Sequence, residues 1–390
     1  MASKEKFLFL EPLRGIFALV VVIVHGGVIG SSSFLLGNER MVANSTMLVD
    51  LFFQLSGFVI AYNYADRIND SATAFVFQFN RLLRMYPLHI VTFLCFAVGF
   101  PLLEYAKELY TGETGEHHAF SDFNLSAIIN NIFLTHGMFE DELTYNYPSW
   151  SVSAEFYTYA TFAIVFAIFS SKASRVFTSI ALVVISALIL HFSDSAYPET
   201  RLALFRCLYS FFLGVLLYYI YDNFRIRVAS IFVYLSFALM FVCWYFGNYL
   251  SSLITPFTYF FIFLSLLWSE SSAMKRLLCT PKLVFLGTIS YGIYMIHAIV
   301  WHAITRVLIV FFDYTEEYDP KIGDTVLNVE PGLSTALLVS GTVVTIFLAY
   351  LSYRYLEMPF NNKRMKMPSR VKGTNAASAY VQGLLKQREP

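Results

Sequence analysis

The chain has 390 residues with 27 basic and 27 acidic side chains, so its formal net charge is zero. Apolar residues make up 57% of it and charged residues 14%. Average soluble domains contain about half apolar and about a quarter charged residues. This composition excludes a disordered chain and one that binds nucleic acid through a basic face, and a soluble domain this apolar would expose too much apolar surface. We therefore expect an all-α protein that crosses a membrane several times.

Ten stretches are long and apolar enough to span a membrane, because a spanning helix needs about 20 mostly apolar residues. A shorter stretch, Leu125–Phe139, also contains Asn130, Asn131 and His136, and we expect it to form a helix that does not span. The ten predicted spans are Leu8–Ile29, Thr46–Ala65, Leu83–Leu103, Pro148–Phe169, Val176–Phe192, Leu202–Tyr221, Val228–Phe246, Ser251–Trp268, Val284–Phe311 and Gly332–Leu356.

The distribution of charge predicts the orientation of these spans. With both termini cytoplasmic and Leu125–Phe139 not crossing, nineteen of the 27 Lys and Arg residues lie on the cytoplasmic side and four on the outer side. This asymmetry is the one that the positive-inside rule expects, whereas making the short stretch a span would reverse the next loops and scatter the charge. The sequence thus predicts about ten spans, a membrane domain over residues 8–357 and a basic cytoplasmic tail over residues 358–390.

Two of the predicted outer loops, Glu104–Asn124 and Asp313–Pro331, are long and acidic. The first contains the neighbouring residues His117 and His118. No cysteine or carboxylate falls at ligand spacing from this pair, and such histidines are more often solvated than metal-bound. We therefore predict no metal site.

The first predicted span carries two ionisable residues, Arg14 and His25. Such residues are costly inside a membrane and often mark function. Eleven positions return a helix to nearly the same face and separate the two side chains by about 16 Å along the axis. Arg14 is then expected near the cytoplasmic edge and His25 near the outer edge. A single membrane histidine can equally be a hydrogen-bonded packing residue, but the shared face favours a functional pair.

Two carboxylates are expected at a depth similar to that of His25. Asp50 lies near the start of the second span, where it could fix the tautomer of the imidazole or satisfy helix-terminal amides near Thr46. Glu155, in the fourth span, could orient the imidazole or anchor neighbouring helices through hydrogen bonds. Both pairs of alternatives stay open from the sequence.

Arg81 and Arg84 lie at the start of the third predicted span and share one helix face at the cytoplasmic headgroup level. Positive charge there could simply orient the span. A second interpretation is a phosphate clamp, because the guanidinium fork matches phosphate oxygens. Together with Arg14, these arginines could hold a polyanionic ligand that enters from the cytoplasm.

Six short blocks of sequence, in this order, resemble the acyltransferase family 3 membrane proteins. The first is Leu13-Arg14-Gly15 followed by His25. The resemblance extends from about Leu10 to Pro359, which is nearly the whole chain. The other blocks are Asp50-Leu-Phe-Phe-Gln-Leu-Ser56-Gly57-Phe, Arg81-Leu-Leu-Arg84-Met-Tyr-Pro87, Trp150-Ser-Val-Ser-Ala-Glu155-Phe-Tyr157, Ser290-Tyr-Gly-Ile-Tyr-Met-Ile-His297 and Arg354-Tyr-Leu-Glu357-Met-Pro359.

The resemblance implies transfer of an acyl group, often acetyl, from cytoplasmic acyl-CoA to a hydroxyl of a cell-surface polysaccharide or a lipid-linked glycan. Arg14, Arg81 and Arg84 would hold the phosphates of the donor. His25 would act as general base or carry the acyl group, and Asp50 or Glu155 would orient it. Residues 8–357 would be the acyltransferase domain, in contact with membrane lipid, and the implied location is the bacterial inner membrane.

The main alternative is a proton-coupled secondary transporter, since buried His, Asp and Glu in ten spans would also suit proton coupling. The sequence lacks clear repeats and pairs of broken helices, however, and its three arginines face one side only. A lipid-binding or scaffolding membrane protein without catalysis is a third interpretation.

Overall fold

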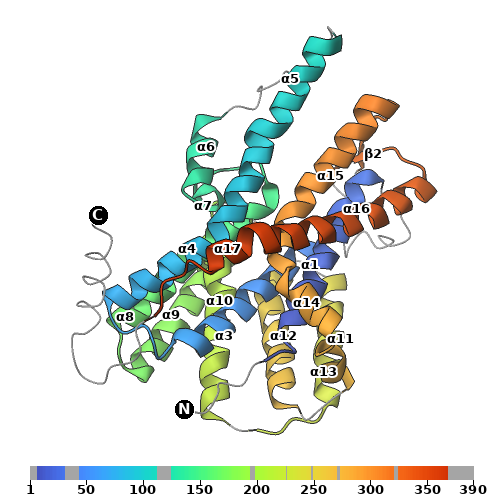
Figure 1. Cartoon of the computed structure of the whole chain (residues 1–390). Helices are drawn as coiled ribbons and strands as arrows, with labels where there is room; N and C mark the ends of the chain where they lie inside the picture. Colours follow the sequence, from blue (N-terminus) through green and yellow to red (C-terminus); the bar gives the residue numbers. More distant parts are fainter. Residues whose placement is uncertain are drawn as a thin grey trace, which may run out of the picture.

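The computed structural model describes residues 7–30, 44–111, 124–193, 198–224, 226–246, 249–269, 273–319 and 324–367, and helices dominate them (Figure 1). The helices of the first half are α1 (Glu11–His25), α3 (Leu48–Tyr64), α4 (Ser71–Leu94), α5 (Phe100–Thr111), α6 (Leu125–Ile132), α7 (His136–Phe139), α8 (Trp150–Ile168) and α9 (Lys172–His191).

The second half continues with further helices and one short antiparallel hairpin. Its elements are α10 (Ala203–Asn223), α11 (Ile231–Tyr245), α12 (Tyr249–Trp268), α13 (Ala273–Leu278), α14 (Pro281–Thr288), α15 (Ser290–Phe312), β1 (Glu316–Asp319), β2 (Asp324–Leu327), α16 (Pro331–Ser352) and α17 (Met358–Asn361). The hairpin lies in the predicted outer loop Asp313–Pro331, whereas His117 and His118 lie outside the described residues.

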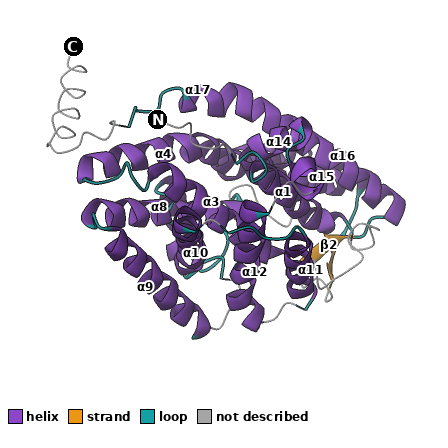
Figure 2. Cartoon of the chain, turned by 90° about the horizontal axis from the view of Figure 1, so that it is seen from below, coloured by secondary structure: helices purple, strands orange, loops and turns teal. Residues whose placement is uncertain are grey.

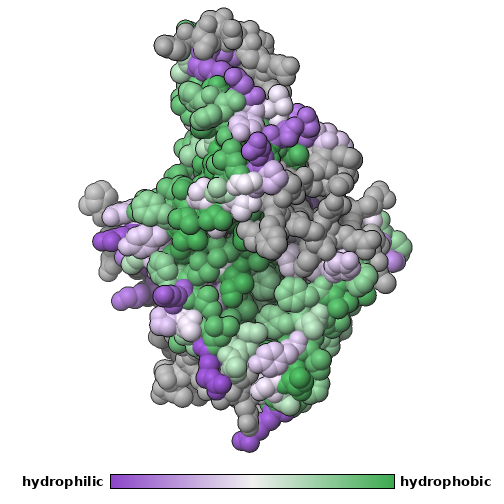
Figure 3. Space-filling view, turned by 90° about the vertical axis from the view of Figure 1, so that its right-hand side faces the viewer, coloured by the Kyte–Doolittle hydropathy of each residue, from purple (hydrophilic) through white to green (hydrophobic). Residues whose placement is uncertain are grey.

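Among the described residues, eight helical segments are long and apolar enough to cross a membrane. The protein is therefore an integral membrane protein built from helices, as the composition predicts. Two of the ten predicted spans, Val228–Phe246 and Ser251–Trp268, contain shorter apolar helices at Ile231–Tyr245 and Leu253–Trp268. The face in Figure 3 is apolar across its middle, with hydrophilic side chains gathered toward its edges. The orientation with both termini cytoplasmic stays a prediction.

The third span is much longer than its apolar stretch. The sequence predicts Leu83–Leu103, whereas the helical segment covers Ser71–Leu109, or 39 residues. Its early start follows from a capping box, in which the Thr73 amide donates to the Asp70 carboxylate at 2.8 Å and the Asp70 amide donates to the Thr73 hydroxyl at 3.2 Å. Hydropathy does not detect such a cap, so residues expected before the span are already helical.

The predicted ninth span, Val284–Phe311, is divided at Ile289 into α14 and α15. At this division α14 packs tightly across the start of α1, since a Cβ on Gly287 would lie 2.2 Å from the Glu11 carbonyl oxygen. The stretch Leu125–Phe139 also forms two helices, α6 and α7, of eight and four residues. Neither is long enough to span, in agreement with the expectation for this stretch.

Helix α10 lies at the centre of one half of the helical assembly and packs against α3, α8, α9 and α12 (Figure 2). Its crossing with α3 depends on two glycines. A Cβ on Gly57 would lie 1.9 Å from the Phe211 carbonyl oxygen, and a Cβ on Gly214 would lie 2.0 Å from that of Gln54. Helix α1 packs against α14, α15 and α16 in the other half. These two arrangements position the residues singled out by the sequence.

Candidate functional site

Two histidines from distant parts of the chain meet at one end of α1. Nδ1 of His25, the last residue of α1, lies 3.0 Å from Nε2 of His297 on α15. The rings are nearly parallel, with an interplanar angle of 12° and centroids 5.0 Å apart. His297 is completely buried, whereas His25 is partly accessible. A hydrogen bond between two imidazoles needs one donor and one acceptor, so each ring fixes the tautomer of the other.

The surroundings of the histidine pair hold α1 against α15. The indole nitrogen of Trp301 donates to the Val22 carbonyl at 3.0 Å. Gly26 follows His25 directly, and a Cβ there would lie 2.3 Å from the Leu338 side chain. A Cβ at position 26 would also lie 2.9 Å from the Trp301 ring, so a larger residue there would have to displace the Leu338 and Trp301 side chains.

A turn before α8 closes over the same pair. The Tyr147 ring contacts His25 edge-on, with centroids 5.2 Å apart, and contacts His297 at 6.0 Å. The neighbouring Asn146 is completely buried, and its amide nitrogen donates to the Met295 carbonyl on α15 at 3.1 Å. The turn is thereby fixed to the helix that carries His297.

The other end of α1 faces a cavity of about 160 Å³ that is strongly basic. Among the described residues that line this cavity, four are arginines and none is acidic. Arg14 comes from α1, Arg81 and Arg84 from α4, and Arg67 follows α3. The Arg81 guanidinium donates to the Tyr64 hydroxyl at 3.2 Å and lies over the Tyr64 and Phe77 rings. The structure thus brings together the three predicted cofactor-binding arginines and adds Arg67.

Glu155, a predicted catalytic residue, lies on the arginine side. Its carboxylate accepts a hydrogen bond of 2.6 Å from the Tyr159 hydroxyl, and Tyr159 lines the arginine cavity. The same hydroxyl lies 2.6 Å from the Ser56 hydroxyl, which also lines it. Glu155 therefore faces the basic cavity through Tyr159, while the contact to a ring nitrogen of His25 comes from His297.

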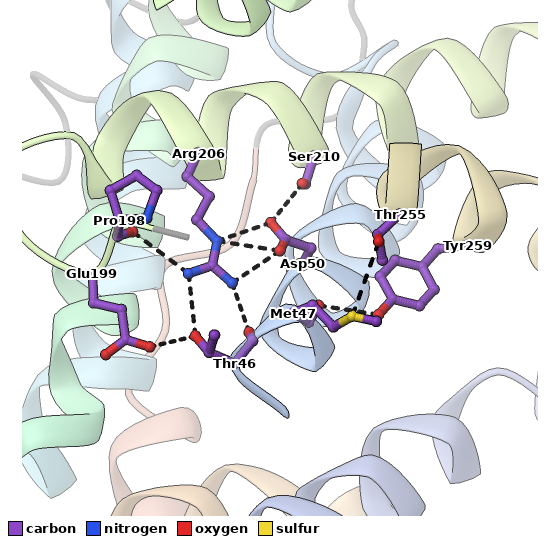
Figure 4. Close-up of polar contacts among 9 residues, drawn as sticks. All are labelled: Thr46, Met47, Asp50, Pro198, Glu199, Arg206, Ser210, Thr255 and Tyr259. Atoms are coloured by element: carbon purple, nitrogen blue, oxygen red, sulfur yellow. Dashed lines mark hydrogen bonds and ion pairs between the residues drawn. The ribbon is translucent and has the colours of Figure 1, made fainter. Parts of the chain in front are cut away.

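Asp50, the other predicted catalytic carboxylate, forms a buried ion pair (Figure 4). Its Oδ2 lies 2.9 Å from Nη2 of Arg206, and its Oδ1 accepts a hydrogen bond of 2.9 Å from the Ser210 hydroxyl. Arg206 also donates to the Thr46 carbonyl at 2.6 Å, and its guanidinium lies over the Trp150 ring. Asp50 therefore joins α3 to α10, and the orienting contact that the sequence suggested for it belongs to His297.

A second histidine pair lies between α4 and α7. The rings of His89 on α4 and His136 on α7 stack with centroids 5.4 Å apart, and both side chains are buried. The Ser149 hydroxyl lies 3.0 Å from Nε2 of His136. Burial, and secondarily the neighbouring His89, lowers the pKa of His136 to about 3. The His136 imidazole is consequently neutral at physiological pH.

Sequence reasoning missed three of these residues as site members. His297 ends one of the six recognised blocks, but helical spacing cannot show which partner a mid-span histidine meets. Arg67 lies in a connection, where a basic residue is ordinarily a topology signal. Arg206 is a lone cation in a span, and this rarity is itself a signal that it needs a buried partner.

Comparisons with known proteins identify the family of the chain. The model of a family described as an acyltransferase domain matches residues 7–354. The chain belongs to acyltransferase family 3. It is 30% identical over 167 residues, 41% of the chain and 82% of the relative, to "Protein 2 in picA locus" of Rhizobium radiobacter.

A second relative is "Acyltransferase MdmB" of Streptomyces mycarofaciens, which is 29% identical over 164 residues. That match covers 40% of this chain and 38% of the relative. No solved structure matches the chain significantly. The protein is an acyltransferase embedded in a membrane.

Proposed function

We propose that this protein is an O-acyltransferase that moves an acyl group, acetyl in the first instance, from cytoplasmic acyl-CoA to a hydroxyl of a cell-surface polysaccharide or a lipid-linked glycan. The observation that carries the proposal is the placement of two sites on one helix. Arg14 lines a basic cavity and His25 meets His297 eleven residues farther along α1. That separation is about 16 Å along a helix axis.

The basic cavity suits the donor's phosphates. Arginine pairs with phosphate oxygens through two parallel hydrogen bonds. The described residues that line the cavity include four arginines and no carboxylate, which leaves that capacity available. The cavity lies at the end of the protein that the charge asymmetry predicts to be cytoplasmic. The pantetheine arm of acyl-CoA would then extend along α1, with its thioester near His25.

The histidine pair suits general base catalysis. Nε2 of His25 removes the proton from the acceptor hydroxyl while the hydroxyl oxygen attacks the thioester carbonyl carbon. Collapse of the tetrahedral intermediate breaks the carbon–sulfur bond, and the leaving thiolate takes the proton from His25. The products are the acyl ester and free CoA, so atoms and charge balance.

His297 supports this role of His25. For Nε2 of His25 to be unprotonated, its Nδ1 must carry the proton and donate it to Nε2 of His297, which lies 3.0 Å away. The second imidazole also stabilises the positive charge that His25 gains in the transition state.

Purified protein in liposomes would test the proposal through acetyl-CoA binding and thioester turnover, with crude surface polysaccharide as acceptor. We expect wild type to bind and turn over, His25→Ala to bind without turnover, and Arg84→Ala to bind poorly. Arg276→Ala is the matched control, because Arg276 is an exposed arginine on α13 outside the cavity.

Three results would count against the proposal. Turnover that survives in His25→Ala would remove the histidine from catalysis. A wild-type protein that binds no acetyl-CoA but takes up a solute in exchange for protons would instead favour the transporter. Equal loss of binding in Arg276→Ala and Arg84→Ala would mean that general positive charge, rather than the cavity, attracts the donor.

A further inference from the structure

The segment that follows the last spanning helix is fixed against α4 next to the basic cavity. The Asn80 amide nitrogen donates to the Met365 carbonyl at 2.9 Å, and the Met365 amide donates to the Asn80 side-chain oxygen at 2.8 Å. Asn80 is 4% exposed and directly precedes Arg81. One asparagine therefore satisfies both main-chain groups of Met365 and holds this part of the tail beside the cavity arginines.

This attachment places a further arginine near the cavity. Arg364 precedes Met365, and one of its terminal nitrogens donates to the Asn361 side chain. Its Nε is buried and has no hydrogen-bond partner among the described residues. A buried guanidinium nitrogen without a partner destabilises the protein, and a hydrogen bond to an anionic ligand would remove that cost.

Arg364 also experiences the positive charges of the cavity. Burial, followed by the charges of Arg81 and Arg84, lowers the pKa of Arg364 to about 10. Like charges gathered in this way are unfavourable unless an anion neutralises them. Arg364 does not line the cavity itself, so it extends the basic site in the direction of the tail.

We propose that residues 361–367 are part of the donor site and that Arg364 binds a phosphate group of the donor. This inference rests on the proposed function. Coenzyme A carries a diphosphate and a separate ribose phosphate, which need cations at two positions. The cavity arginines hold one of these groups. Arg364 holds the other, and its position is fixed by the hydrogen bonds between Asn80 and the adjacent Met365.

The test measures binding of acetyl-CoA and of inorganic pyrophosphate to the full-length protein in zwitterionic nanodiscs. Arg364→Gln should weaken acetyl-CoA binding on the order of tenfold, the effect of one lost charge-assisted hydrogen bond. Asn80→Ala should weaken it similarly, because the tail is then no longer fixed. Lys363→Gln removes the same charge from the adjacent, exposed residue and should change binding by less than about twofold.

A labelling experiment on wild type avoids any folding defect of the variants. An arginine-specific dicarbonyl reagent, followed by peptide mass spectrometry, should modify Arg364 in the free protein and modify it less when acetyl-CoA is bound. The inference is overturned, and the proposed function stands, if Arg364→Gln binds acetyl-CoA as tightly as wild type. The same holds if Lys363→Gln loses as much affinity for acetyl-CoA as Arg364→Gln does. If wild type binds pyrophosphate through Arg364 but binds no acetyl-CoA, the phosphate site stands and the proposed donor is wrong.

Anionic lipid is the other source of a phosphate group at this edge of the membrane. Nanodiscs that contain phosphatidylglycerol provide that comparison in the same labelling assay. Protection of Arg364 by the anionic lipid but not by acetyl-CoA would overturn the inference, because the residue would then serve a headgroup.

Discussion

His25 and His297 hold ring nitrogens 3.0 Å apart although 272 positions separate them in the chain. One histidine ends α1 and the other lies in the first half of α15. A direct contact between two imidazoles leaves one ring as donor and the other as acceptor. The pair therefore offers a base with a defined tautomer, which neither histidine offers alone.

Replacing His297 should reduce turnover more than donor binding. In His297→Ala, Nδ1 of His25 loses its hydrogen-bond partner, and we expect kcat to fall by about a hundredfold or more. KM for acetyl-CoA should change little, because the arginine cavity is untouched. Steady-state kinetics in liposomes would measure both constants.

His297→Gln is the informative companion variant. The glutamine carbonyl can still accept a hydrogen bond from His25, so part of kcat should return, and the pH profile of kcat should shift because a second imidazole no longer faces His25. If kcat and acetyl-CoA binding both decrease, and decrease equally in His297→Ala and His297→Gln, His297 has a packing role only.

Breaking the Asp50–Arg206 pair should destabilise the fold. Removing one partner leaves a buried charge uncompensated, so Arg206→Met should cost about 3–5 kcal/mol. Thermal unfolding in detergent should show a large decrease in Tm. The double variant Asp50→Leu/Arg206→Met removes both charges and should recover part of the loss. If the double variant loses as much stability as the two single variants together, the result would contradict a direct pairing of Asp50 and Arg206.

The crossing of α3 and α10 should not tolerate a methyl group. Gly214→Ala would place a Cβ 2.0 Å from the Gln54 carbonyl oxygen, so the helices must separate. The expected cost is about 1–3 kcal/mol. Gly332→Ala is the control, since no atom lies within 4 Å of a Cβ there. Denaturation experiments in detergent should show a lower stability for Gly214→Ala and an unchanged stability for Gly332→Ala. An equal loss of stability in both variants would argue against this tight crossing.

Acid should destabilise the protein partly through His136. The folded protein lowers the pKa of His136 from its ordinary 6.5 to about 3, so the unfolded chain binds a proton first as pH falls. This contribution to stability is fully present above pH 6.5 and declines toward pH 3, by up to about 1.4 kcal/mol per pH unit.

Unfolding temperatures measured between pH 7 and pH 5 would detect this effect. Wild type should lose more stability over that range than His136→Gln, whose side chain can still bond to Ser149. Parallel curves for the two proteins would mean that His136 is not buried in its neutral form.

The sequence predicted the membrane class, the short helices near residues 125–139 and the gathering of three arginines. Those features follow from hydropathy, length and local spacing, which act within a single helix. The partner of His25 and that of Asp50 depend instead on which helices pack together. Arg206 is 156 positions from Asp50, and His297 is 272 positions from His25. Sequence periodicity carries no information about such distant pairings.

Under the proposed function, helix α1 would also set a minimum length for the acyl donor. Arg14 and His25 are attached to one rigid helix, with about 16 Å of axis between them. A compact activated acyl compound such as acetyl phosphate, gripped by the arginines, would leave its reactive carbon far from the imidazole. The spacing of Arg14 and His25 would thus select donors by the distance between their phosphate and their reactive carbon, independently of contacts to the acyl group.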